Sequence, residues 1–341
     1  MKVTGFYWER FAFNFNTSFK NSGRVYREKE GFYIYAEIDN LNTFVGECSP
    51  LPGVNSESIG DVALELEQLN DNIIGFEFYD YGETVSFINR TTPVSSIKFA
   101  LTQIFFTSLL TEILPDSLSI KLNGIISRGD IQDVLHNISI LAKNGFNTIK
   151  LKIGNDSPEN EITVIREIAD RFPAVSFRLD ANSALSYQEA LNFIDKISGL
   201  NIEYFEDPLA SPDEMKKLSE ISPIPIAADT FISGLSDINQ FMHNSRIRHF
   251  IIKPMAFQDT PSLPAITFPE GAQIIISSSF ESFVGRIFNY ILASRFSNVH
   301  GLATASLLNE GLIDTPFRED LPVITFAPKN VLSWLNDKVL Y

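Results

Sequence analysis

The sequence predicts a (β/α)8 barrel preceded by a smaller α+β domain, and two observations support this fold class. From residue 118 onward, short stretches rich in Ile, Val and Phe alternate with polar–apolar helical stretches, as expected of parallel βα units. The first 115 residues lack this repeat and have the pattern of antiparallel strands followed by helices. The 341 residues of the chain are enough for one large barrel and one smaller domain.

Residues 1–115 are expected to form an α+β domain, which the C-terminal tail at 316–341 completes. Three stretches alternate partly like antiparallel strands and two later ones have helical periodicity. The strand stretches are 3–15, 30–38 and 42–48, and the helical stretches are 58–73 and 94–110. Trp334 is expected to anchor the tail on this domain. The loop at 46–58, with its Pro and Gly residues, could close over the barrel mouth, although a plain linker would look the same.

Residues 116–315 are expected to form the barrel, and eight short apolar stretches predict its strands. These stretches are 118–123, 148–153, 175–180, 202–206, 224–229, 249–253, 273–277 and 299–303. Several of the helical stretches between them begin with Ser, Asp or Pro, which favour helix N-termini. The stretch at 257–270 carries three prolines where a helix is due, so this crossover is expected to be short or non-helical.

Composition and charge exclude several classes of partner. A net charge of −15 argues against nucleic acid and anionic membranes, while it permits an anionic small molecule beside a bound cation. A single cysteine, Cys48, excludes an internal disulfide and a cysteine metal cluster. No apolar stretch reaches membrane-spanning length and the N-terminus lacks a signal-peptide pattern, so a cytoplasmic protein is expected. The sequence does not predict an oligomeric state.

Five charged residues end successive strand stretches at intervals of about 25 residues, and they carry the functional prediction. They are Lys152, Asp180, Glu206, Asp229 and Lys253. Parallel βα units bring the carboxyl ends of neighbouring strands to one face, so we expect the five side chains to meet. Three carboxylates are suited to a hard divalent cation such as Mg²⁺, and the two lysines are candidate proton carriers.

Simpler interpretations exist for each residue taken alone. Each acid could be a helix N-cap or a solvated loop residue, and Lys150 with Lys152 could belong to a surface edge strand. Lys150 shares a strand face with Lys152, and Arg178 shares one with Asp180. We expect Lys150, Arg178 and Asn182 to support the metal ligands, although Arg178 and Asn182 could be structural only.

The expected substrate contacts are Ser278, Ser279 and Gly53. Ser278 and Ser279 belong to the sequence SSSFES at 277–282, which follows the seventh strand stretch and precedes a helix. Hydroxyl groups and backbone N–H groups at such a place can bind a substrate carboxylate, and they can equally serve as a helix cap. Gly53 lies in the loop expected to cover the barrel.

Together these residues resemble the enolase superfamily, and within it the muconate-lactonizing subgroup. The motifs are KLK (150–152), LDAN (179–182), YFEDP (204–208), AADT (227–230) and IIKP (251–254). The resemblance covers nearly the whole chain. It implies an α+β capping domain on a modified (β/α)8 barrel, with catalytic lysines at 152 and 253. It also implies a Mg²⁺ ion, replaceable by Mn²⁺, that is held by the acids at 180, 206 and 229.

Three further motifs are similar to the o-succinylbenzoate synthase family of menaquinone biosynthesis: GECSPLPGVNSES (46–58), RLDAN (178–182) and SSSFES (277–282). This resemblance implies a hydro-lyase that acts on a small-molecule carboxylate. Its members dehydrate 2-succinyl-6-hydroxy-2,4-cyclohexadiene-1-carboxylate to 2-succinylbenzoate by abstracting the α-proton and stabilising an enediolate. The alternatives are an N-acylamino acid racemase or dipeptide epimerase of the same subgroup, a muconate cycloisomerase, and a catalytically silent metal-binding barrel.

Overall fold

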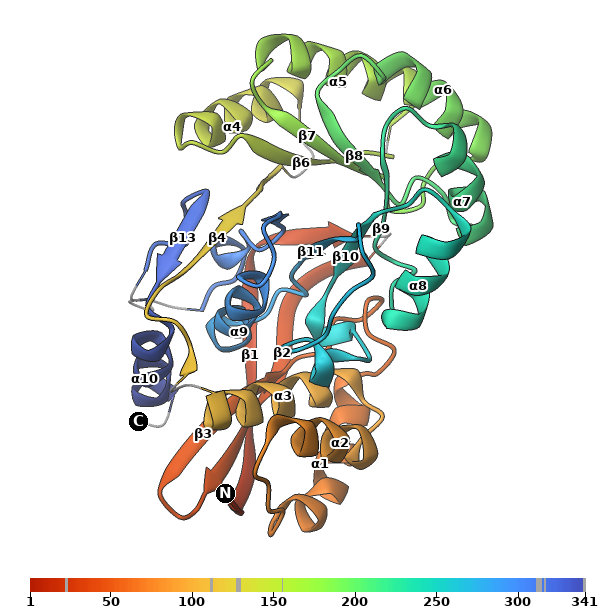
Figure 1. Cartoon of the computed structure of the whole chain (residues 1–341). Coiled ribbons are helices and arrows are strands. Elements are labelled where there is room, and N and C mark those ends of the chain that lie inside the picture. The colour runs from red at the N-terminus through yellow and green to blue at the C-terminus, as the bar shows by residue number, and fades with distance from the viewer. Residues whose placement is uncertain are drawn as a thin grey trace.

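A computed structural model describes residues 1–21, 24–110, 113–126, 130–154, 156–310, 315 and 317–339. Figure 1 shows an N-terminal sheet with three helices at one end of the molecule and the barrel, surrounded by helices, at the other. No described helix has both the length and the apolar character needed to span a membrane.

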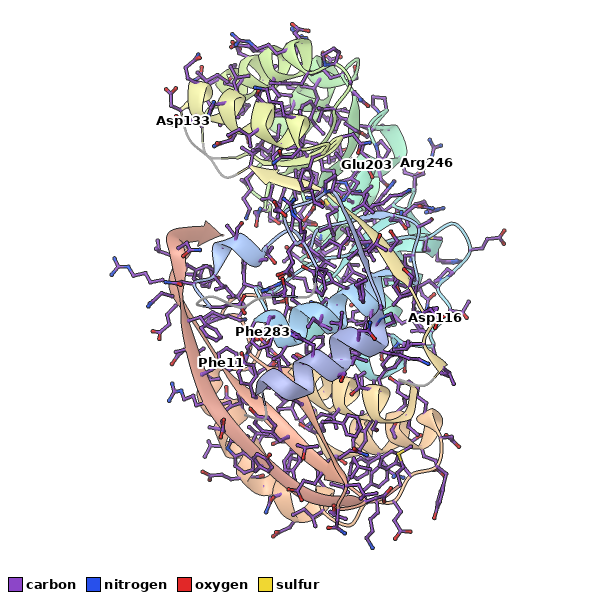
Figure 2. All side chains as sticks on the ribbon, turned by 90° about the vertical axis from the view of Figure 1, so that its left-hand side faces the viewer. Phe11, Asp116, Asp133, Glu203, Arg246 and Phe283 are labelled. Carbon is purple, nitrogen blue, oxygen red and sulfur yellow. The ribbon has the colours of Figure 1, made fainter. Side chains whose placement is uncertain are left out.

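The N-terminal sheet is antiparallel, with strand order β1-β2-β3. Its strands are β1 (Val3–Asn21), β2 (Arg24–Ile38) and β3 (Asn42–Cys48), which confirms the three predicted strands. The two long strands β1 and β2 continue beyond the helices and run along one side of the molecule toward the barrel (Figure 2). The sheet can therefore contact the barrel mouth as well as its own helices.

Three helices follow, namely α1 (Ile59–Ile73), α2 (Tyr81–Thr91) and α3 (Ser95–Leu110). The first and third were predicted, whereas α2 was missed because its apolar residues are few. A capping box of Ser58 and Asp61 begins α1. Helix α3 packs so closely on β3 that a side chain at Gly46 would overlap the carbonyl group of Ala100, and this contact requires glycine.

The barrel contains a seven-stranded parallel sheet in the order β11-β10-β9-β8-β7-β6-β5. Its strands are β5 (Gly124–Ile126), β6 (Thr148–Lys152), β7 (Ser176–Asp180), β8 (Ile202–Glu206), β9 (Ile226–Ala228), β10 (His249–Ile252) and β11 (Gln273–Ile276). Its helices are α4 (Ile131–Lys143), α5 (Pro158–Arg171), α6 (Tyr187–Ile197), α7 (Pro212–Ile221), α8 (Leu235–Asn244) and α9 (Phe283–Ala293). The predicted fold class is confirmed.

The first predicted barrel strand needs a correction. Residues 118–123 were expected to begin the parallel sheet, but β4 (Leu118–Leu122) pairs with β12 (Val299–His300) and, antiparallel, with β13 (Val323–Phe326). The separate strand β5 begins the seven-stranded sheet after Asn123. The ring then continues from β11 to β12, because the amide of Gly301 donates to the carbonyl of Ile276 at 2.9 Å.

The proline-rich crossover and the tail complete the fold. The crossover at 257–270 contains only a short 3-10 helix, η3 (Thr260–Ser262), as its prolines predicted, and a second one, η2 (Pro254–Ala256), directly precedes it. In the tail, β13 lies beside β4 and α10 (Pro328–Val339) follows it (Figure 1). The half-buried Trp334 packs edge-to-face on Phe283 of α9, with 5.8 Å between the ring centres.

Candidate active site at the carboxyl ends of the barrel strands

The structure brings the five predicted charged residues to one end of the parallel sheet. Lys152, Asp180 and Glu206 are the last residues of β6, β7 and β8, and they are matched in register across the three strands. Asp229 and Lys253 directly follow β9 and β10. Strand order places β7, β8 and β9 between the two lysine-bearing strands. The three acids therefore lie between the lysines along the sheet.

All five side chains line one cavity of about 80 Å³ together with Lys150 and Asn182. The rest of its described lining is mostly apolar, with Ile125, Ile251 and Ile275 from the barrel. Leu51 and Val54 come from the loop after β3, and this loop therefore reaches the cavity as expected. Charged groups among apolar walls interact more strongly than they would in water.

Lys150 forms ion pairs with two of the acids. Its Nζ lies 2.8 Å from Asp180 Oδ2 and 2.8 Å from Glu206 Oε2. Burial alone would lower the pKa of Lys150, but the carboxylates of Asp180 and Glu206 outweigh it and raise that pKa well above its usual value. Burial, and after it the neighbouring Asp180, raises the pKa of Glu206. Burial would also raise the pKa of Asp180, but Lys150 and then Lys152 outweigh it and lower that pKa.

The pKa values of the other two lysines, Lys253 and Lys152, are shifted in opposite directions. Lys253 donates to both carboxylate oxygens of Asp229. Burial opposes the charge on Lys253, but Asp229 prevails and raises its pKa. Lys152 is different, because burial dominates and lowers its pKa to about 8. Lys152 is therefore the lysine that loses its proton most readily, as a general base must.

The described side chains do not present three or more His, Cys, Asp or Glu groups arranged around one point as a metal site. Their chemistry nevertheless fits a divalent cation. Asp180, Glu206 and Asp229 are oxygen donors, and lysine ammonium groups contact all three. Glu206 Oε2 is buried and makes no hydrogen bond, although Lys150 Nζ lies beside it. A buried carboxylate oxygen without a hydrogen bond is available to a cation.

Asn182 and Arg178 were both expected near the ligands, and the structure places them differently. Asn182 donates from its amide side chain to Asp180 Oδ1 at 2.6 Å. Buried Arg178 instead holds Glu203 with two hydrogen bonds, at 2.7 and 3.0 Å, and donates to Asn123. Two residues of a strand span about 6.6 Å, so Arg178 lies one layer deeper in the barrel than Asp180. The prediction that Arg178 contacts the ligand carboxylates is therefore wrong, because its side chain binds Glu203 and Asn123 instead.

Of the three expected substrate contacts, Ser278 lines the cavity, whereas Ser279 and Gly53 are not among its described lining residues. Ser279 is fully buried, and Gly53 is exposed on the loop that carries Leu51 and Val54.

The backbone amides at the N-terminus of α9, which were expected to be able to bind a substrate carboxylate, donate to side chains of the chain instead. Those of Ser282 and Gly285 donate to Glu47, and that of Phe283 donates to Glu310. These amides bind carboxylates of the chain itself.

Two further residues shape the site without having been predicted. Buried Asp207 follows Glu206 and accepts the amides of Asp229 and Thr230 at 3.1 and 2.7 Å, which fixes the backbone beside Asp229. The sequence contained one indication of Asp207, because this acid directly follows Glu206, a predicted metal ligand. Asn55 binds the carbonyl of Met255 at 2.9 Å and so ties the loop after β3 to the barrel. Nothing in the local pattern marks this long-range contact.

Residues 134–257 match the family model described as "Enolase C-terminal domain-like". This range runs from α4 to the segment after β10 and contains all five charged residues that end the strands. The resemblance to the enolase superfamily is confirmed. Its members are enzymes, and the prediction of an enzyme is confirmed at this level.

Two relatives with different activities match this chain at similar identity. The o-succinylbenzoate synthase of Vibrio cholerae is 26% identical over 324 residues, which cover 92% of each chain. The L-amino acid-D/L-Glu epimerase of Sulfurimonas denitrificans is 24% identical over 249 residues, 70% of this chain and 72% of the relative. Sequence similarity alone therefore supports the superfamily and leaves both activities as candidates.

A solved structure supports the fold. The o-succinylbenzoate synthase of Thermosynechococcus elongatus, complexed with Mg in its active site, superposes with a TM-score of 0.72 at 22% identity. The match covers 87% of this chain and 92% of that structure. At this identity the likeness concerns the fold alone.

Proposed function

We propose that the protein is an o-succinylbenzoate synthase that removes water from 2-succinyl-6-hydroxy-2,4-cyclohexadiene-1-carboxylate to give 2-succinylbenzoate. The observation that carries the proposal is one cavity lined by three carboxylates, with lysines from β6 and β10 on either side of them along the sheet. A synthase that matches 92% of the chain supports this choice of reaction.

Asp180, Glu206 and Asp229 would hold a Mg²⁺ ion, and Mn²⁺ would replace it. When bound, the cation supplies positive charge that stabilises the negative charge developing on the substrate carboxylate. Asn182 keeps the Asp180 carboxylate oriented through its 2.6 Å hydrogen bond. Asp207 holds the backbone of Asp229 in place through the amides of residues 229 and 230.

Lys152 acts as the base and then as the acid. In its neutral form it removes the proton from the carbon next to the substrate carboxylate. The released electron pair forms a ring double bond, the carbon–oxygen bond breaks, and the departing hydroxide takes the proton back from Lys152 as water. The ring becomes aromatic, which drives the step. Lys253 stays protonated beside Asp229 and provides a fixed positive charge from the far side.

A second candidate is an epimerase or racemase of the same subgroup. It is favoured by the presence of a lysine on each side of the acids, because proton exchange on both faces of a substrate needs two such groups. The epimerase relative supports it over a shorter part of the chain, 70% compared with 92% for the synthase. We therefore place dehydration first.

One experiment separates the two candidates. The purified protein is incubated in D₂O with Mg²⁺, in one vessel with the cyclohexadiene carboxylate and in another with dipeptides and N-acylamino acids. The proposal predicts loss of cyclohexadiene absorbance and formation of 2-succinylbenzoate, both stopped by a chelator. Deuterium incorporation at the α-carbon of the amino acid substrates, with no dehydration, would replace the proposal by the epimerase.

A further inference from the structure

Three charged side chains lie buried between the N-terminal sheet and the barrel, and we call Lys29, Glu47 and Glu281 the interdomain charge cluster. Lys29 on β2 is 1% exposed, and the two glutamates are fully buried. Burial lowers the pKa of Lys29 to about 8, so Lys29 is a cation at neutral pH. Buried charges are costly unless each is paired and hydrogen-bonded, and each of these has several partners.

Lys29 joins the two domains directly. Its ammonium group donates to the carbonyl of Ser279 at 2.8 Å and to the carbonyl of Ser49. Ser49 follows β3 in the N-terminal domain, whereas Ser279 belongs to the loop 277–282 between β11 and α9. A single buried ammonium thus fixes this barrel loop against the N-terminal sheet.

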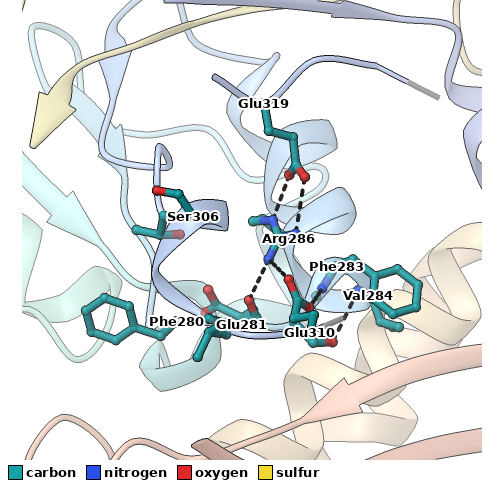
Figure 3. Close-up of polar contacts among 12 residues, drawn as sticks. Phe280, Glu281, Phe283, Val284, Arg286, Ser306, Glu310 and Glu319 are labelled. Carbon is teal, nitrogen blue, oxygen red and sulfur yellow. Dashed lines mark hydrogen bonds and ion pairs between the residues drawn. The ribbon is translucent and has the colours of Figure 1, made fainter. Parts of the chain in front are cut away.

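Glu47 caps a barrel helix from the other domain. Its carboxylate accepts the amide of Ser282 at 3.0 Å and that of Gly285 at 2.8 Å, both at the N-terminus of α9. A carboxylate is favourable there because it satisfies free amides and faces the positive end of the helix dipole. Glu310 accepts the Phe283 amide and is held by Arg286, as Figure 3 shows. The start of α9 is therefore fixed by side chains from two distant segments.

The loop held in this way has a strained backbone. Phe280 has a φ of 60°, a left-handed conformation that is unfavourable for a bulky residue. Ser278 Oγ accepts the amide of Phe280 at 2.8 Å and donates to Glu281 at 2.6 Å. Both Ser278 and Phe280 line the cavity of the candidate active site. The strained conformation therefore determines part of the cavity wall.

We infer that Lys29 and Glu47 are positioning residues for substrate recognition, which hold the loop 277–282 so that Ser278 and Phe280 form the cavity wall. Neither Lys29 nor Glu47 is among the lining residues that the structure describes, so both act through the loop. The inference deepens the proposed function and rests on it. The shape of the substrate cavity thus depends on the docking of the N-terminal sheet.

The test uses Lys29→Met and Glu47→Gln, which nearly preserve side-chain volume, in the full-length protein with Mg²⁺. Each folded variant is expected to raise KM for the cyclohexadiene substrate about tenfold while kcat changes by less than about threefold. The amides of Ser282 and Gly285 should lose protection from hydrogen exchange. Lys2→Met removes an exposed ammonium beside the same sheet and should leave all three quantities unchanged.

Wild-type KM together with wild-type amide protection in a folded Lys29→Met or Glu47→Gln protein would overturn the inference. If neither variant folds, hydrogen exchange of the wild-type protein tests whether the loop 277–282 is fixed. Exchange of the Ser282 and Gly285 amides only through global unfolding supports a fixed loop, whereas exchange through a local opening contradicts it. A wild-type protein that does not dehydrate the substrate refutes the proposed function alone, because hydrogen exchange still reports on the loop.

Discussion

At the scale of single residues, the three lysines of the candidate site differ in their contacts with the three acids and in the direction of their pKa shifts. Lys150 lies 2.8 Å from carboxylate oxygens of both Asp180 and Glu206, and Lys253 contacts both oxygens of Asp229. Lys152 has the lowered pKa of the three, because burial outweighs its acidic neighbours. The three lysines therefore have different roles although all line the same cavity.

Replacement of Lys152 by Ala should abolish dehydration while the protein stays folded. The neutral amine of Lys152 is the base in the proposed reaction, and removal of such a group typically costs about 10²–10⁴ in rate. Turnover is measured by absorbance and folding by circular dichroism. Lys121→Ala, at an exposed position on β4, is the matched control and should keep full activity. Activity of Lys152→Ala near the wild-type rate would remove this residue from the mechanism.

At the scale of elements, the short strand β12 closes the barrel with a buried histidine. The Nδ1 atom of His300 accepts the amide of Ile276 at 3.1 Å, so His300 is neutral and carries its proton on Nε2. Burial lowers its pKa from 6.5 to about 4. Protonation would convert the acceptor into a donor and break this contact between β11 and β12.

The acid stability of the fold should therefore depend on His300. Between pH 6.5 and 4 the unfolded chain binds a proton at His300 that the folded chain does not. Stability from this residue is complete above pH 6.5 and falls by about 1.4 kcal/mol per pH unit down to pH 4. Urea unfolding of wild type and His300→Gln measures the effect. The stability difference between the two should shrink or reverse as the solution is acidified, and a constant difference would contradict the assignment.

Sequence patterns predicted the ends of β6 to β10 well, because each of these strands is a short apolar stretch that ends at or directly before a charged residue. They failed where a distant partner decides the outcome. The pairing of β4 with β12 and β13 is set by residues that lie far along the chain. The depth of Arg178 in the barrel and the capping of α9 by Glu47, 235 residues from Ser282, likewise depend on tertiary structure. Local periodicity carries no signal for such contacts.

At the scale of the whole molecule, the two domains share an aromatic interface besides the interdomain charge cluster. Buried Phe288 of α9 packs on Phe99 and Phe106 of α3, with ring centres 5.5 and 5.6 Å apart. Gln103 of the same helix donates to the carbonyl of Val284 at 2.9 Å. The N-terminal domain is therefore docked on the helix that follows the cavity-lining loop 277–282.

Phe288→Ala should destabilise the protein by about 3–5 kcal/mol, because it removes a fully buried ring from this interface. Denaturant unfolding measures the loss, and Tyr79→Ala, at a side chain that is 76% exposed, is the control. A loss below about 1 kcal/mol would show that the interface contributes little to folding.

Calorimetric titration of Mg²⁺ tests whether the carboxylates from three neighbouring strands hold one divalent cation, as we propose. We expect saturable binding of one ion by the wild-type protein and binding at least about tenfold weaker in Asp180→Asn and Glu206→Gln. Asp213→Asn, on an 83% exposed side chain, should bind like the wild type. Equal Mg²⁺ affinity in all four proteins, or no binding by the wild type, would refute the metal site.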